Sequence, residues 1–202
     1  MTVMTRLETG AVPPCETHLF GLVSGANVRT PCGERRVENL RPGDLIVTRT
    51  DGLQALRHVI RITLSHEDLR KTPGLAPIRL MPRALGPMMP GRPLALAPNH
   101  RVRVPAYLLA EDARDATLNL PACELLDKFE NAFVDLGGDA LSSGVTYHSL
   151  VFDTPQVFAV NGVLVDSYSP DEASLGALDI DTQSALRRLF PELDEERPAA
   201  LH

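Results

Sequence analysis

Apolar and polar residues alternate along several stretches of the chain, which is the pattern of half-buried β-strands. The longest alternation covers residues 54–65, where Leu56, His58 and Ile60 share one face with further apolar residues. Residues 145–153 follow the same period of two. We therefore expect two long strands here, with His58 as a core histidine.

Two short motifs predict tight turns between strands. In residues 157–165, two apolar runs are joined by Asn161 and Gly162, a pair that suits a type I′ hairpin because both central residues need a positive φ. In the sequence RPGD, Pro42 fixes φ and Gly43 accepts the positive φ of a type II turn. Both motifs favour antiparallel strands.

Helices are expected to be few and short. Residues 81–93 contain four prolines and two glycines and are predicted to form a loop. Short helices are expected at 105–112 and 121–130, and another in the tail with Asp181 or Thr182 as its cap. Many short strands with turn signals predict a mostly β, barrel-like or sandwich domain.

Composition sets limits on the class of protein. Apolar residues make up 44% and charged residues 23% of 202 residues, so the chain can bury a core as one domain with tails. There is no long apolar run and no secretory signal, which favours a cytoplasmic, non-membrane protein. Three unpatterned cysteines fit reduced thiols. No metal-ligand or dinucleotide spacing is present, and we expect no cofactor.

The charge is distributed unevenly along the chain. Residues 29–103 hold 14 Arg and Lys against 6 Asp and Glu, whereas residues 171–202 hold 3 against 8. The basic segment offers an alternative function, nucleic-acid binding. The arginines are spread singly and aromatic residues are few, so solvated strand faces explain the pattern better and nucleic acid is not the expected partner.

The sequence APNHRV places His100 directly before a strand-like alternation. Together with VENLRPGDLIVT and NGVLVDSYSP, in this order and spacing, it resembles the Hint domain in its free-standing bacterial form. Hint domains form the fold shared by inteins and the autoprocessing part of hedgehog proteins. The resemblance extends through residues 21–52, 77–104, 118–128 and 145–170. It implies a mostly β, horseshoe-like fold of twisted strands and hairpins with one or two short helices.

The resemblance also implies a chemistry, protein splicing or autoprocessing. In the family, a Cys or Ser at the first position attacks the carbonyl of the preceding residue, and a histidine matching His100 protonates the departing nitrogen. The first position here is Gly21, which has no nucleophile. Cys32 lies in a turn, too far along the chain for an acyl shift at this peptide bond.

Further positions depart from the family pattern. Ala97 replaces a Ser or Thr, and His148 stands one place out of register, so that Ser149 takes the usual histidine position. Pro155 and Asp166 replace a second histidine and the terminal asparagine. We therefore expect a domain that keeps the fold and has lost the self-cleavage chemistry, and that acts as a binding or structural module with a protein partner.

We expect the chain to consist of a flexible leader at 1–19, a Hint-like domain at 20–170 and an acidic tail at 171–202 with a short helix. Asp153 and Asp166 are candidate acid–base partners of His100. The alternative function is an active autoprocessing domain that cuts between Phe20 and Gly21, which a reactive side chain at the carbonyl of Phe20 would favour.

Overall fold

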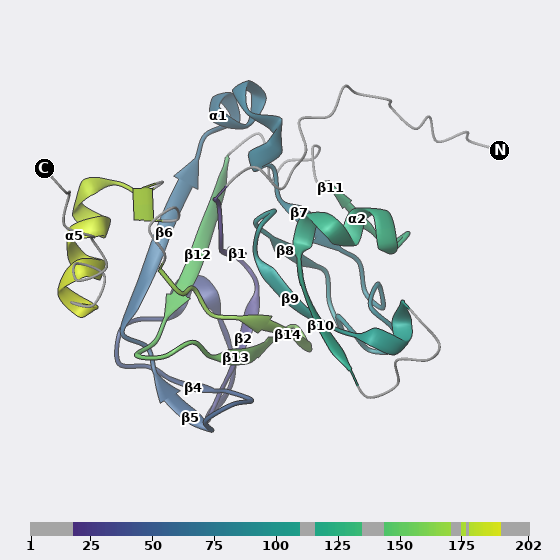
Figure 1. The fold of residues 1–202 in the computed structure, drawn as a ribbon, viewed down its shortest axis with the longest axis horizontal. Helices are drawn as coiled ribbons and strands as arrows, with labels where there is room; N and C mark the ends of the chain where they lie inside the picture. Colours follow the sequence, from purple (N-terminus) through teal and green to yellow (C-terminus); the bar gives the residue numbers. More distant parts are fainter. Residues whose placement is uncertain (1–17, 110–115, 135–143, 171–174, 177, 191–202) are drawn as a thin grey trace, which may run out of the picture.

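The described residues form two six-stranded sheets and a separate two-stranded hairpin (Figure 1). The structure is a computed structural model, and it describes residues 18–109, 116–134, 144–170, 175–176 and 178–190. All paired strands are antiparallel. The expected mostly β fold is confirmed. Of the leader expected at 1–19, residues 1–17 lie outside the described residues, as does most of the tail outside one helix, and Leu19 is buried.

The elements have the following bounds. In spatial order, the first sheet is β11 (Ala132–Val134), β7 (Ile78–Leu80), β8 (Leu94–Leu96), β1 (Leu22–Val23), β12 (Val145–Val151) and β6 (His58–Leu64). The second sheet is β10 (Thr117–Pro121), β9 (Arg101–Pro105), β14 (Val163–Asp166), β13 (Val157–Val160), β2 (Asn27–Thr30) and β3 (Gly33–Arg36). The hairpin is β4 (Leu45–Val47) and β5 (Leu53–Ala55), and the helices are α1 (His66–Lys71), α2 (Leu125–Lys128) and α5 (Ile180–Leu189).

Both sheets contribute to one large hydrophobic core. Leu22 and Leu96 of the first sheet and Val102 and Val165 of the second are fully buried in the same cluster. Burying one such side chain stabilises the fold by about 1.5–3 kcal/mol relative to leaving it exposed. The core therefore fixes the first strand, β1, in the middle of the molecule, and with it the residues that precede β1.

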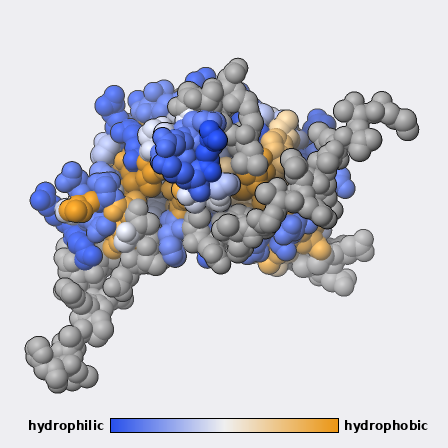
Figure 2. Space-filling model, turned by 90° about the horizontal axis from the view of Figure 1, so that it is seen from above, coloured by the Kyte–Doolittle hydropathy of each residue, from blue (hydrophilic) through white to orange (hydrophobic). Residues whose placement is uncertain are grey.

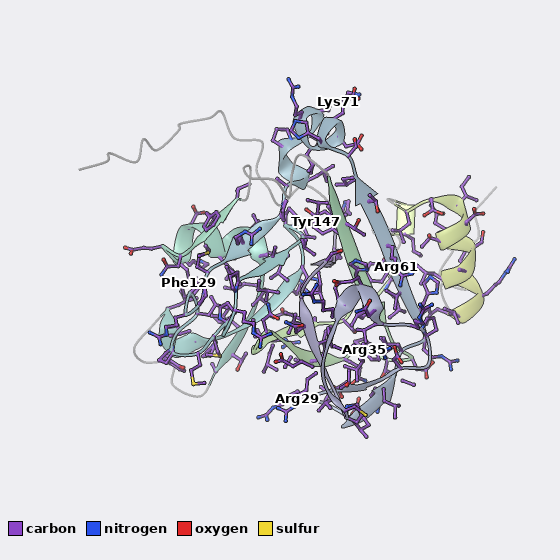
Figure 3. The ribbon with its side chains drawn as sticks, turned by 180° about the vertical axis from the view of Figure 1, so that it is seen from behind. Arg29, Arg35, Arg61, Lys71, Phe129 and Tyr147 are labelled. Carbon is purple, nitrogen blue, oxygen red and sulfur yellow. The ribbon has the colours of Figure 1, made fainter. Side chains whose placement is uncertain are left out.

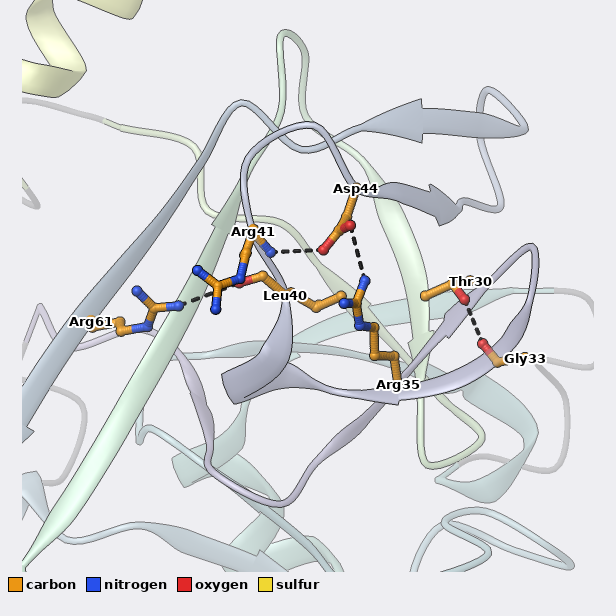
Figure 4. Close-up of polar contacts among 7 residues, drawn as sticks. All are labelled: Thr30, Gly33, Arg35, Leu40, Arg41, Asp44 and Arg61. Carbon is orange, nitrogen blue, oxygen red and sulfur yellow. Dashed lines mark hydrogen bonds and ion pairs between the residues drawn. The ribbon is translucent and has the colours of Figure 1, made fainter.

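The two predicted turns are present. Asn161 has φ 49° and Gly162 has φ 88°, as a type I′ turn between β13 and β14 requires. Gly43 has φ 92°, and Asp44 N donates to Arg41 O over 3.1 Å. The Asp44 carboxylate also accepts hydrogen bonds from the backbone N–H of Arg41 and from the Arg35 guanidinium (Figure 4).

The predicted helices are shorter than expected. Up to residue 109, the segment expected at 105–112 forms a single 3₁₀ turn at Ala106–Leu108. The segment at 121–130 forms a 3₁₀ turn at Ala122–Glu124 followed by α2. Pro105 and Pro121 are the last residues of β9 and β10, so strand pairing takes positions that local sequence assigns to a first helical turn.

The C-terminal helix packs on the first sheet next to β6 (Figure 1). Its Leu186 is fully buried in a cluster with Ile60, Val151 and Tyr168. The cap is Asp179, whose carboxylate accepts from the N–H of Thr182, so the expectation of Asp181 or Thr182 as cap was wrong. An N-cap side chain usually accepts a hydrogen bond from the N–H of the residue two or three positions later, as Asp179 does from Thr182.

The cysteines differ from the expectation of three reduced thiols. Cys123 is disulfide-bonded, which makes that expectation wrong for Cys123. Cys32 is free and exposed in the turn between β2 and β3, as predicted. Cys15 lies outside the described residues.

Seen from above, the surface at α1 is largely hydrophilic, and hydrophobic side chains show on either side of this helix (Figure 2). No helix among the described residues combines the length and the apolar character that crossing a membrane requires.

Candidate functional site

The peptide bond between Phe20 and Gly21, here called the junction, is held by side chains from distant parts of the chain. The Gly21 N–H donates to His100 Nδ1 over 3.3 Å, and Ser149 Oγ donates to the Phe20 carbonyl oxygen over 3.1 Å. On the next peptide, the Ala97 N–H donates to the Gly21 carbonyl over 2.8 Å. Both sides of the junction are therefore fixed.

Strand pairing explains why these residues meet. β1 lies between β12 and β8, with Leu22 opposite His148 on one side and opposite Leu96 on the other. The residue before β1 is therefore flanked by Ser149 of β12 and by Ala97, which follows β8. His100 directly precedes β9, and its N–H donates to the Ala97 carbonyl over 3.0 Å.

His100 is buried, and its position sets its protonation state. Because Nδ1 accepts the Gly21 N–H, the ring proton resides on Nε2, which has no hydrogen-bond partner among the described residues. Burial lowers the pKa of His100 to about 4, against the opposing effect of the negative charge on Asp166. At neutral pH the imidazole is uncharged. It accepts a hydrogen bond from the N–H of Gly21 and donates none to the junction.

Gly21 is in a conformation and a space that disfavour a side chain. Its φ is +137°, which residues other than glycine rarely adopt. A Cβ at this position would lie 3.0 Å from the Tyr147 Cβ, 3.1 Å from the His148 nitrogen and 3.2 Å from Ser149 Oγ. Tyr147 itself lies in the interior (Figure 3), and its hydroxyl donates to the Leu75 carbonyl over 2.7 Å. The space is thus bounded by groups that are themselves fixed.

Ser149 is a hydroxyl side chain in direct contact with the junction carbonyl. Its hydroxyl proton is directed at the carbonyl oxygen, as in an oxyanion hole, rather than towards a base. Among the described contacts, Ser149 Oγ has no hydrogen bond to either His100 or His148. A serine nucleophile needs a neighbouring base to take its proton. The geometry therefore polarises the junction carbonyl without supplying an activated nucleophile.

His148 is on the opposite side of β12 from Ser149, because neighbouring residues of a strand face opposite ways. Its Nε2 lies 2.9 Å from Ser24 Oγ, and its buried Nδ1 has no partner within the described part of the chain. Burial and the nearby Arg61 lower the pKa of His148, while Glu38 raises it. The imidazole of His148 is thus bonded to Ser24 and has no hydrogen bond to the junction among the described contacts.

The two carboxylates expected near His100 have different surroundings. Asp166 accepts two hydrogen bonds from Arg103, at 2.7 and 3.2 Å, and one from Asn119 Nδ2 at 2.7 Å. It acts on His100 through its charge. Asp153 is 70% exposed and forms a 2.8 Å ion pair with Arg57. The structure brings Asp166 near the histidine, and it places Asp153 on the surface.

Sequence reasoning missed two parts of this arrangement. The Arg103–Asp166–Asn119 cluster joins β9, β14 and β10, and the alternating pattern of β9 shows only that Arg103 faces away from Val102 and Val104. The contact of the Ala97 N–H with Gly21 is a backbone contact, which side-chain identity does not signal. Among the described residues, no group of three or more His, Cys, Asp or Glu is placed to hold a metal ion.

Comparisons with known proteins extend this description. The chain is similar to a bacterial intein-like domain from Clostridium thermocellum, with 15% identity, a TM-score of 0.46 and coverage of 73% of this chain and 98% of that one. It is also similar to the gp41-1 intein, with 12% identity, a TM-score of 0.42 and coverage of 73% and 98%. A search of the curated proteins finds no significant match. The model of the Hint domain family matches residues 20–172, about three quarters of the chain, and the chain therefore belongs to the Hint domain family.

Proposed function

We propose that this Hint domain holds its junction peptide without cleaving it and acts as a binding or structural module for a protein partner. The observation that carries the proposal is the closed space around Gly21. The position from which the family's nucleophile attacks is glycine, and an added Cβ would lie 3.0 Å from a buried side-chain atom.

Two of three chemical requirements for an acyl shift are unmet. The reaction needs a nucleophile beside the carbonyl, a group that stabilises the developing oxyanion, and an acid that protonates the departing nitrogen. Ser149 meets the second requirement. The first is missing at Gly21, and the third is missing because His100, with a pKa of about 4, is neutral at pH 7.

The alternative is cleavage at the junction with Ser149 as the nucleophile, which its 3.1 Å contact with the Phe20 carbonyl oxygen favours. In that reaction the Ser149 oxygen bonds to the Phe20 carbonyl carbon, the bond to the Gly21 nitrogen breaks, and the hydroxyl proton passes to that nitrogen. The product is an ester that links residues 1–20 to Ser149, with no change in the total mass.

Nucleic-acid binding by the basic segment is less well supported. Five of its arginines form ion pairs with carboxylates within the described residues, which lowers the charge available to phosphates: Arg35, Arg36, Arg57, Arg92 and Arg103. A mobility shift of DNA or RNA that weakens steeply with salt would support this alternative instead.

Hydroxylamine separates the two cleavage outcomes, because at neutral pH it attacks esters much faster than amides. The amide it does attack, at Asn161–Gly162, is present in all three proteins and would give the same fragments in each. The wild-type chain and Ser149→Ala are incubated at neutral pH with hydroxylamine, and their intact masses are measured, with Ser24→Ala as a matched serine control. We expect residues 1–20 to stay attached in all three proteins. Release of residues 1–20 from the wild type and from Ser24→Ala, but not from Ser149→Ala, would establish the alternative.

A further inference from the structure

A pocket next to the junction offers hydrogen-bond donors and a positive charge. Its volume is about 430 Å³, within the range of small-molecule sites, and Phe20 forms part of its wall. Arg101 and Arg103 line it from β9, and Ser167 and Ser169 line it from the segment after β14. The lining of the pocket therefore combines apolar and polar side chains.

The charges of the pocket do not cancel. Asp166 is the acidic residue that lines it, and its carboxylate is engaged by Arg103 and Asn119. Arg101 has no ion pair or hydrogen bond among the described residues, and its side chain is exposed. One arginine charge is thus left over, which favours an anionic ligand.

The hydrogen-bond inventory points the same way. Ser167 Oγ accepts from the Gln156 N–H over 2.9 Å, so its own proton remains available to a ligand. Arg103 uses Nε and one Nη on Asp166, which leaves the N–H groups of the other Nη. The carboxylate oxygens of Asp166 already accept hydrogen bonds from Arg103 and Asn119. The Thr50 hydroxyl donates to Gln156 Oε1. Asn119 Oδ1 is a buried acceptor without a partner in the same lining. The free donors of Arg101, Arg103 and Ser167 outnumber it, so a ligand that mainly accepts hydrogen bonds is favoured.

The apolar part of the lining decides between an inorganic anion and an organic one. It consists of Phe20, Pro155 and Val157. A carboxylate fits the planar fork of an arginine in a bidentate manner, and its apolar body would cover these three residues. We infer that this pocket binds a small organic carboxylate, with its charge on Arg101 and its apolar body against Phe20. The inference goes beyond the proposed function, and it rests on it because Phe20, which lines the pocket, must stay attached to the domain.

Phenylacetate is a suitable probe, and phenylacetamide is its uncharged control. Each is titrated into the full-length ¹⁵N-labelled chain, and amide shifts are followed by NMR. We expect saturable shifts at Val157, Ser167 and Ser169 with phenylacetate and none with the amide. Arg101→Gln should weaken binding at least tenfold, because a charge-assisted contact is lost. Arg29→Gln, an exposed arginine of β2 outside the pocket, should leave it unchanged.

Several outcomes would overturn the inference. These are an absence of saturable shifts, equal binding of the amide, equal loss in Arg29→Gln, or equally tight binding of inorganic phosphate. The intact mass of each sample is measured before and after the titration. A sample that stays intact but binds no phenylacetate contradicts only this inference, whereas a sample that loses residues 1–20 contradicts the proposed function.

Discussion

Replacing Gly21 with alanine tests whether the junction has room for a side chain. Two costs add at this position. A non-glycine residue at φ +137° is strained by about 1–3 kcal/mol. A Cβ placed 3.0 Å from the Tyr147 Cβ and 3.1 Å from the His148 nitrogen forces neighbouring groups apart, which costs about another 1–3 kcal/mol. We expect the free energy of unfolding to fall by about 2–6 kcal/mol.

Gly25→Ala is the matched control for the strain alone. Gly25 has φ +94°, and a Cβ added there meets no atom within 4 Å. Its replacement should cost about 1–2 kcal/mol, the price of a left-handed backbone in a residue with a side chain. The difference between the two variants therefore reports the steric contact at the junction together with the extra strain of the larger φ at Gly21.

Urea denaturation followed by circular dichroism measures both free energies, and thermal melting provides a second reading. A loss of 2–6 kcal/mol corresponds to a fall in Tm of roughly 5–20 °C for a chain of this size. If Gly21→Ala is no less stable than Gly25→Ala, the site accommodates a side chain. In that case the closed space around Gly21 does not explain why this position carries glycine, and the reasoning is refuted.

Three further predictions follow from the buried polar groups. Because the pKa of His100 is lowered from 6.5 to about 4, stability should be complete above pH 6.5 and fall by about 3 kcal/mol as the pH drops to 4. Urea titrations at several pH values should show a shallower fall for His100→Gln; an equal fall would exclude His100 as its source. Asp166→Asn should cost about 1–3 kcal/mol because it removes the ion pair of the half-buried Arg103, while the exposed Asp153→Asn should cost under about 1 kcal/mol in the same assay. Equal losses would show that burial does not distinguish the two carboxylates. Asn161→Ala should cost about 2–4 kcal/mol, because it removes side-chain hydrogen bonds to the Asn27 N–H and the Pro93 carbonyl at a residue with φ 49°. A melting temperature equal to that of the wild type would contradict this.

The parts of the fold that sequence predicts are those that local chemistry determines. Asn161 and Gly162 need positive φ in any type I′ turn, and Gly43 needs it in a type II turn, so both turns follow from a few residues. The prediction of a helix at 105–112 was wrong up to residue 109, where the structure has a 3₁₀ turn, and the reason is the opposite one. Local sequence favours a helix after Pro105, but pairing of β9 with β10 extends the strand through that residue.

The candidate site was only partly accessible to sequence reasoning. His100 and Gly21 follow from the family resemblance, and so does the position of Ser149 in register with the usual histidine. The contact of Ser149 with Phe20 spans 129 residues and depends on the pairing of β1 with β12, which no local pattern specifies. Likewise, Asp153 and Asp166 both stand at the ends of strands, and only their packing shows that one is half-buried and the other exposed.

The central claim is that the bond between Phe20 and Gly21 persists in the folded protein. The most direct measurement is the intact mass of the purified chain over several days at neutral pH, with and without a thiol. The account predicts a single species with residues 1–20 still attached at every time point. The appearance of a chain that begins at Gly21, in proportion to the time of incubation, would contradict it.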